Sequence, residues 1–105
     1  MEKLLEPIPP GEILQEEYLI PLELSPNQLA VDIDIPVGRI NEIISGHLAI
    51  TADTALRFAR YFETSPQLWL GLQSDYDLRC ATRKRGRQII QRIHPYQEIH
   101  HKELR

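Results

Sequence analysis

Three polar side chains able to hydrogen-bond to nucleobases or DNA backbone stand close together in the sequence, at Arg39, Asn41 and Glu42. An asparagine amide pairs with the edge of adenine, and a glutamate carboxylate accepts from the amino group of cytosine. The arginine would lie near the backbone or the groove wall, and Val37 would meet the methyl group of a thymine. This chemistry indicates recognition of a DNA sequence, if the residues lie on a short helix that fits the major groove.

The surrounding residues, 25–51, have the hydrophobic spacing of two short helices joined by a turn. Each helix has its own apolar stripe, and together the stripes comprise Leu29, Ala30, Ile33, Ile40, Ile43 and Ile44. Ile35 fills the turn between them, so the two helices can close over one core. The sequence therefore predicts a helix-turn-helix whose second helix enters the major groove.

The residues expected to contact DNA lie on or beside this second helix: Gln28, Pro36, Val37, Gly38, Arg39, Asn41, Glu42 and His47. Backbone N–H groups at the helix starts near Ser25 and Thr51 are candidate phosphate contacts. The charge balance of residues 25–51 opposes DNA binding, because Arg39 is set against three carboxylates. We therefore expect modest affinity unless the basic C-terminal segment takes part.

Capping signals divide the rest of the chain into further helices. Pro9, Pro10 and Gly11 open a first helix that Pro21 ends. Ser25 and Pro26 open the second, Pro36 and Gly46 bound the third, Thr51 caps the fourth, and Ser65 and Pro66 open the fifth. Asp34 occupies the turn, where aspartate tolerates a left-handed conformation. The prediction is an all-α chain of five helices.

Charge changes sharply along the chain. Residues 1–78 have a formal charge of minus 9 and residues 79–105 of plus 6, which together give minus 3. We therefore divide the chain into a helix-turn-helix domain, residues 1–81, and a basic C-terminal tail, residues 82–105. Arg83, Lys84, Arg85 and Arg87 form either a phosphate-binding patch or a solvated basic end. Residues 88–93 could be a short strand or a further helical turn.

Composition argues against several other classes of protein. With 105 residues and 42% hydrophobic content, the chain can build one small core. No apolar run is long enough to span a membrane, no signal segment opens the chain, and Cys80 stands alone, so we expect a cytoplasmic protein. We expect no catalytic group, no cofactor and no metal, because the candidate ligands His94, Glu98, His100 and His101 lack a zinc-type spacing.

The sequence resembles the HigA-type antitoxins, close to the VapI group. The resemblance covers roughly residues 9–81 and rests on PPGEILQEEYLIPLELS (9–25), RINEIISG (39–46), ITADTALRFARYFETSPQLWLGLQ (50–73) and YDLRCA (76–81). It implies a five-helix, lambda-repressor-like fold in a dimer that binds its own operator. It also implies that the protein neutralises a RelE-like toxin that cleaves messenger RNA.

A homodimer is expected on geometric grounds too. One recognition helix covers few base pairs, whereas a two-fold dimer places two of them about 34 to 36 Å apart on a palindromic operator. Trp69 and Tyr76, on the fifth helix, belong either to the core or to the dimer interface. Two alternatives remain: a toxin-sequestering module with little DNA binding, and a free-standing repressor without a toxin.

Overall fold

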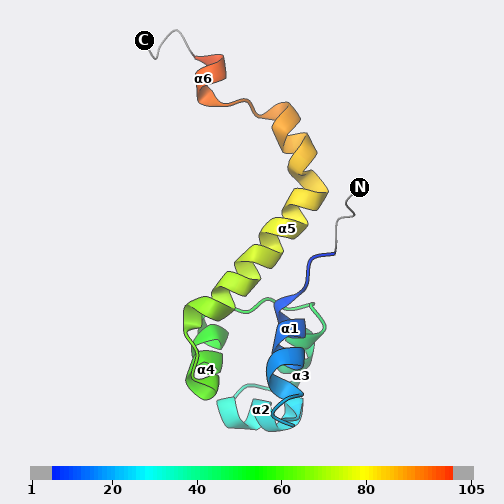
Figure 1. The fold of residues 1–105 in the computed structure, drawn as a ribbon, viewed down its shortest axis with the longest axis vertical. Coiled ribbons are helices and arrows are strands. Elements are labelled where there is room, and N and C mark those ends of the chain that lie inside the picture. The colour runs from blue at the N-terminus through cyan, green and yellow to red at the C-terminus, as the bar shows by residue number, and fades with distance from the viewer. Residues whose placement is uncertain (1–5, 101–105) are drawn as a thin grey trace.

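The computed structural model describes residues 6–100, and their regular elements are all helices (Figure 1). They are α1 (Pro10–Ile13), the π-helix η1 (Leu14–Leu19), α2 (Pro26–Ile33), α3 (Val37–Ile44), α4 (Ala52–Phe62), α5 (Pro66–Arg92) and the one-turn α6 (Tyr96–Ile99). Since η1 continues α1 directly, the five expected helices are present, with α6 in addition. None of the helices within residues 6–100 is long and apolar enough to cross a membrane.

Three of the helices begin at the caps that the sequence predicts. The side-chain oxygens of Ser25, Thr51 and Ser65 accept hydrogen bonds from the backbone N–H three residues further on, at 3.0, 3.3 and 3.1 Å. Pro26 and Pro66 each occupy the first helical position, where a missing N–H costs nothing. The N-terminal ends of α2, α4 and α5 are therefore fixed by local sequence.

The first helix changes its winding after one turn, a feature that the sequence pattern did not predict. In η1 the N–H of Ile20 donates to the carbonyl of Gln15 at 3.0 Å, the i to i+5 bond of a π-helix. This winding brings residues five apart to one face, and Leu14 and Leu19 are both buried. Pro21 follows at once, as expected of a residue that stops the helix.

The core joins the helix-turn-helix to the helices on either side of it. Leu29, Ile40 and Phe58 are fully buried, and Trp69 from α5 lies against Phe58 with ring centroids 4.9 Å apart. The indole N–H of Trp69 donates to the hydroxyl of Thr64 at 2.8 Å. With no exposed surface left, Trp69 is a core residue, so of the two alternatives for it, the core and a dimer interface, the structure has the core.

The long helix α5 leaves the body and projects beyond it (Figure 1). It runs through residue 81 without a break, so the change in charge there has no counterpart in secondary structure. Of the two conformations open to residues 88–93, the structure has the helix, which ends at Arg92. The projecting arm accounts for the elongated shape, whose extents are 61 × 34 × 21 Å.

Candidate nucleic-acid interface

A tight left-handed turn fixes α3 against α2. Asp34 adopts φ 60° and ψ 51°, the conformation expected of it, and ends α2. The N–H of Ile35 then donates to the carbonyl of Ala30 at 3.0 Å, and the Ile35 side chain is buried between the two helices. With Ile40 and Ile43 also buried, α3 has a single orientation on the body.

The opposite face of α3 carries the residues predicted to read DNA. Exposed side chains or backbone are found at Pro36, Val37, Gly38, Arg39, Asn41 and Glu42. Pro36 is the N-cap, one position before the helix, and has no side-chain oxygen to cap it. The structure therefore brings these six residues together on one surface around the start of α3.

The three polar groups of this face are available to a ligand. Within residues 6–100, the side chains of Arg39, Asn41 and Glu42 form no hydrogen bond or ion pair. The backbone of Glu42 is engaged, because its carbonyl accepts from the N–H groups of His47 and Leu48 at 2.9 and 3.1 Å. The loop after α3 is thus anchored by backbone, while the side chains that could specify bases point outward.

The remaining predicted contacts are exposed, but several already have protein partners. Gln28 donates from its amide to Asp32 at 2.7 Å, and His47 Nδ1 lies 2.8 Å from the Ser45 hydroxyl. Ser25 and Thr51 use their side-chain oxygens as helix caps. Each of these residues could therefore contact DNA only through donor or acceptor atoms that are not used in its hydrogen bond within the protein.

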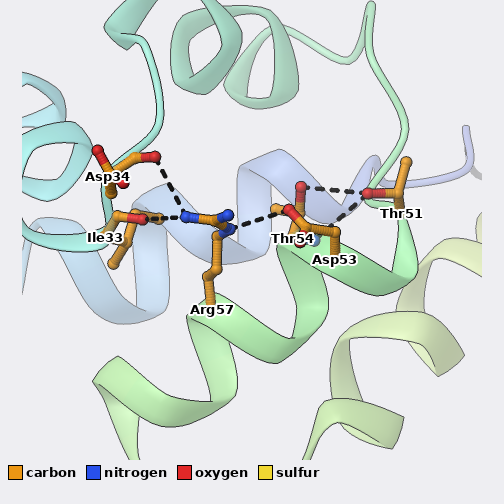
Figure 2. Close-up of polar contacts among 6 residues, drawn as sticks. All are labelled: Ile33, Asp34, Thr51, Asp53, Thr54 and Arg57. Atoms are coloured by element: carbon orange, nitrogen blue, oxygen red, sulfur yellow. Dashed lines mark hydrogen bonds and ion pairs between the residues drawn. The ribbon is translucent and has the colours of Figure 1, made fainter.

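A clamp between Arg57 of α4 and the turn was not predicted from the sequence. One guanidinium nitrogen, Nη1, donates to the carbonyls of Ile33 and Asp34 at 2.8 and 3.2 Å, and Nε pairs with Asp53 at 2.9 Å (Figure 2). The carbonyls at the end of α2 lack helical partners, and this fork satisfies two of them. Arg57 thereby ties the turn that positions α3 to α4.

Two exposed carboxylates, Asp32 and Asp34, lie on α2 and at its end. Asp32 accepts a 2.6 Å hydrogen bond from the Tyr61 hydroxyl, which lowers the pKa of Asp32, and the bond from Gln28 lowers it further. The same bond raises the pKa of Tyr61. The pair is therefore held as carboxylate and neutral phenol, and the negative charge persists at neutral pH.

The basic residues of α5 are not brought to this surface. Arg83, Lys84, Arg85 and Arg87 are exposed on the half of α5 that projects away from α2 and α3 (Figure 1). Arg83 lies 3.4 Å from Glu6 near the N-terminal segment. In a single protomer these cations cannot share a DNA surface with α3, so their role as phosphate contacts stays a prediction.

Two other groups of predicted residues lie along α5 and α6. Tyr76 is half-buried, and a hydrogen bond to half-buried Cys80 raises the pKa of its phenol. Neither of the two roles weighed for Tyr76 is decided by this position. His94, in the link between α5 and α6, lies 3.3 Å from Glu98 of α6, whereas His101 lies outside the described residues.

Known proteins share this arrangement over most of the chain. The helix-turn-helix family model matches residues 16–69. Virulence-associated protein I of Dichelobacter nodosus is 53% identical over 74 residues, which are 70% of this chain and 68% of that protein.

Solved structures extend the likeness along α5. An addiction module antidote protein of the HigA family from Coxiella burnetii is 47% identical with a TM-score of 0.83, over 88% of this chain and 100% of that one. The antitoxin HigA of Pseudomonas aeruginosa, solved with the higBA promoter, is 42% identical with a TM-score of 0.83. That match covers 86% of this chain and 98% of the Pseudomonas chain.

Proposed function

Because this chain belongs to the helix-turn-helix family and, within it, to the HigA-type antitoxins of the VapI group, we propose that it represses its own operon as a homodimer and neutralises a RelE-like toxin that cleaves messenger RNA. The exposed, unpaired set of polar side chains on α3 is the observation that carries the repressor part of this proposal. Such a repressor acts on DNA in the cytoplasm.

The reading chemistry follows from the positions on α3. Asn41 can pair bidentately with adenine, Glu42 can accept from cytosine, and Val37 can meet a thymine methyl. Arg39 adds the one cation of this surface, at the groove wall. The likeness to the Pseudomonas aeruginosa antitoxin HigA, which was solved with the higBA promoter, supports DNA binding by this chain.

The toxin part of the proposal rests on family membership. A RelE-like partner should be encoded beside this gene as a small basic protein, since such toxins bind RNA. Expression of that neighbour alone should arrest growth, and co-expression of this chain should restore it. Restored growth without a physical complex between the two proteins would contradict neutralisation by binding.

The repressor is tested by fluorescence anisotropy on the DNA upstream of its own gene and on a scrambled duplex, across a salt series. Replacing Arg39 and Asn41 by alanine should reduce the preference for the upstream DNA by about 10-fold or more, because a bidentate base contact is worth about 1–3 kcal/mol. Arg60→Ala removes an equal charge from an exposed site on α4 and serves as the control. Unchanged preference in the double variant would refute α3 as the reading helix.

The acidic balance of this surface favours a second candidate, a toxin-sequestering module with little DNA binding. Its specific observation is that Asp32, Asp34 and Glu42 are all exposed, whereas Arg39 is the one lysine or arginine among residues 25–51. Equal affinity of the unmodified protein for the two duplexes at every salt concentration would support this candidate against the repressor. A repressor without a toxin partner would bind its upstream DNA. In the growth assay, no neighbouring gene product would arrest growth that this chain then restores.

A further inference from the structure

A groove of about 480 Å³ lies between the C-terminal part of η1 and the end of α4. We call it the η1–α4 groove. The residues that matter for its chemistry are three aromatic residues, one leucine and two glutamates: Tyr18, Tyr61, Phe62, Leu22, Glu17 and Glu63. None of these residues is among those predicted to contact DNA, so the groove is a second surface with no role in the reading chemistry.

The lining of the groove is largely apolar and is only partly covered by the protein itself. The Phe62 ring has its centroid 4.8 Å from that of Tyr18 and 5.1 Å from that of Tyr61, so the three rings are in contact, and each residue is half-buried. Leu22 is 60% exposed, and the nearby Ile20 is 56% exposed. The groove therefore offers aromatic and aliphatic surface that a partner could bury.

The charges of the groove are all negative. Glu17 and Glu63 are exposed, and within residues 6–100 their side chains form no hydrogen bond or ion pair. The described residues that line the groove include no lysine, arginine or histidine. Such a groove complements an arginine or lysine side chain, because the aliphatic stem packs on the rings while the cation reaches the carboxylates and the aromatic faces.

The end of α4 does not itself need a carboxylate beside the groove. Glu63 ends the helix with a φ of 57°, in the left-handed region that glycine adopts most easily. Its side chain forms no polar bond among the described residues that would offset this strain. A glutamate at this position is accounted for if its carboxylate binds a partner.

We propose that the η1–α4 groove binds a basic segment of the toxin. The inference rests on the proposed function, in which the toxin is a small basic protein, and it assigns the surface of this chain that the toxin contacts. An apolar side chain of the segment packs on Leu22 and the rings, and a neighbouring arginine or lysine lies between Glu17 and Glu63. Since the groove shares no residue with the predicted DNA contacts, toxin and operator do not compete for the same side chains.

Charge reversal tests the groove in the full chain, with the protein encoded by the neighbouring gene as the probe in isothermal titration calorimetry. The double variant Glu17→Lys/Glu63→Lys should raise the dissociation constant about tenfold or more, because like charges would then face each other. The control Glu12→Lys/Glu98→Lys changes the net charge equally at exposed carboxylates outside the groove and should stay within about twofold.

The outcomes separate this inference from the proposed function. An unchanged constant in the groove variant, or an equal loss in both variants, would overturn the groove as the contact surface and leave the toxin assignment standing. Absence of such a neighbour, or of any complex with the unmodified chain, would reject the toxin part of the proposed function and the inference with it. Circular dichroism should show the same helix content in both variants.

Glu63→Gly separates a role in binding from a role in folding. Glycine suits the left-handed backbone, so the variant should be at least as stable as the unmodified protein in urea unfolding. Its affinity for the toxin should nevertheless fall about threefold, because one carboxylate of the groove is lost. Unchanged affinity would contradict the proposed role of Glu63 in the groove.

Photocrosslinking identifies the occupant directly. Benzoylphenylalanine in place of Leu22 should link to the toxin, and mass spectrometry should place the link beside an arginine or lysine of the toxin. The same group in place of Ile90, which is 75% exposed on the projecting part of α5, should give no link to the toxin. A link from residue 22 to a second copy of this chain in place of the toxin would overturn the inference.

Discussion

Gly11 allows α1 to approach the reading helix more closely than any other residue would permit. A Cβ at this position would lie 2.5 Å from the carbonyl carbon of Ile43 and 2.6 Å from the Cα of Ile44, and nearer still to the carbonyl oxygen of Ile43. All three are backbone atoms of α3, so no side-chain rotation relieves the clash. In Gly11→Ala, α3 must retreat by at least 0.8 Å at Ile44 to reach ordinary contact at 3.4 Å.

The cost of this retreat can be estimated from its parts. Overpacking a core costs about 1–3 kcal/mol, and the upper end applies because rigid backbone is displaced. The greater helix preference of alanine returns up to about 1 kcal/mol. The free energy of unfolding should therefore fall by about 2 kcal/mol, which corresponds to a drop in Tm of about 10 °C for a domain of this size.

Urea unfolding and thermal melts followed by circular dichroism measure this change. Gly38→Ala is the matched control, because a Cβ at Gly38 meets nothing within 4 Å, and it should be at least as stable as the unmodified protein. Since α3 carries the reading residues, Gly11→Ala should also weaken binding to the upstream DNA at a temperature where the variant is fully folded. A variant as stable as the unmodified protein would refute the reasoning, because the close approach would then have no energetic consequence.

Two further predictions concern the contacts that surround the helix-turn-helix. Arg57→Met should lower the free energy of unfolding by about 1 kcal/mol, since the lost hydrogen bonds to the Ile33 carbonyl and its neighbour are partly solvated; Arg60→Met, on an exposed part of α4, should change it little, and equal effects in urea unfolding would contradict the clamp. The bond from Tyr61 to Asp32 lowers the pKa of the carboxyl and raises that of the phenol. Its contribution should therefore be lost as pH falls below the ordinary carboxyl value of 3.8 or rises above the ordinary phenol value of 10.0. The stability difference between the unmodified protein and Tyr61→Phe, measured by urea unfolding across pH, should be constant in between and shrink at both ends; a difference that did not change with pH would contradict the pairing.

Local signals were sufficient to predict most of the element boundaries. Ser25, Thr51 and Ser65 cap their helices because a hydroxyl can satisfy an N–H three residues away, and this bond involves no distant part of the chain. The turn at Asp34 could also be predicted locally, because aspartate tolerates the left-handed conformation that ends α2. The exposed face of α3 could be predicted because the buried positions of a helix recur every three or four residues.

Contacts between distant segments required the tertiary structure. Arg57 lies 24 residues from Ile33, and its role depends on how α4 packs beside the turn. The clash that requires glycine at residue 11 is with α3, more than 30 residues away. The burial of Trp69 was one of two open alternatives, because apolar spacing alone does not distinguish a core contact from an interface.

The sequence by itself determined where the helices start and which face of α3 is exposed, because capping and helical periodicity act over a few residues. The tertiary structure decided that the basic residues extend along a projecting α5 instead of lying beside α3, and that the turn of the helix-turn-helix is held by α4. Those features depend on how helices pack in three dimensions, which the spacing of residues within any one helix does not specify.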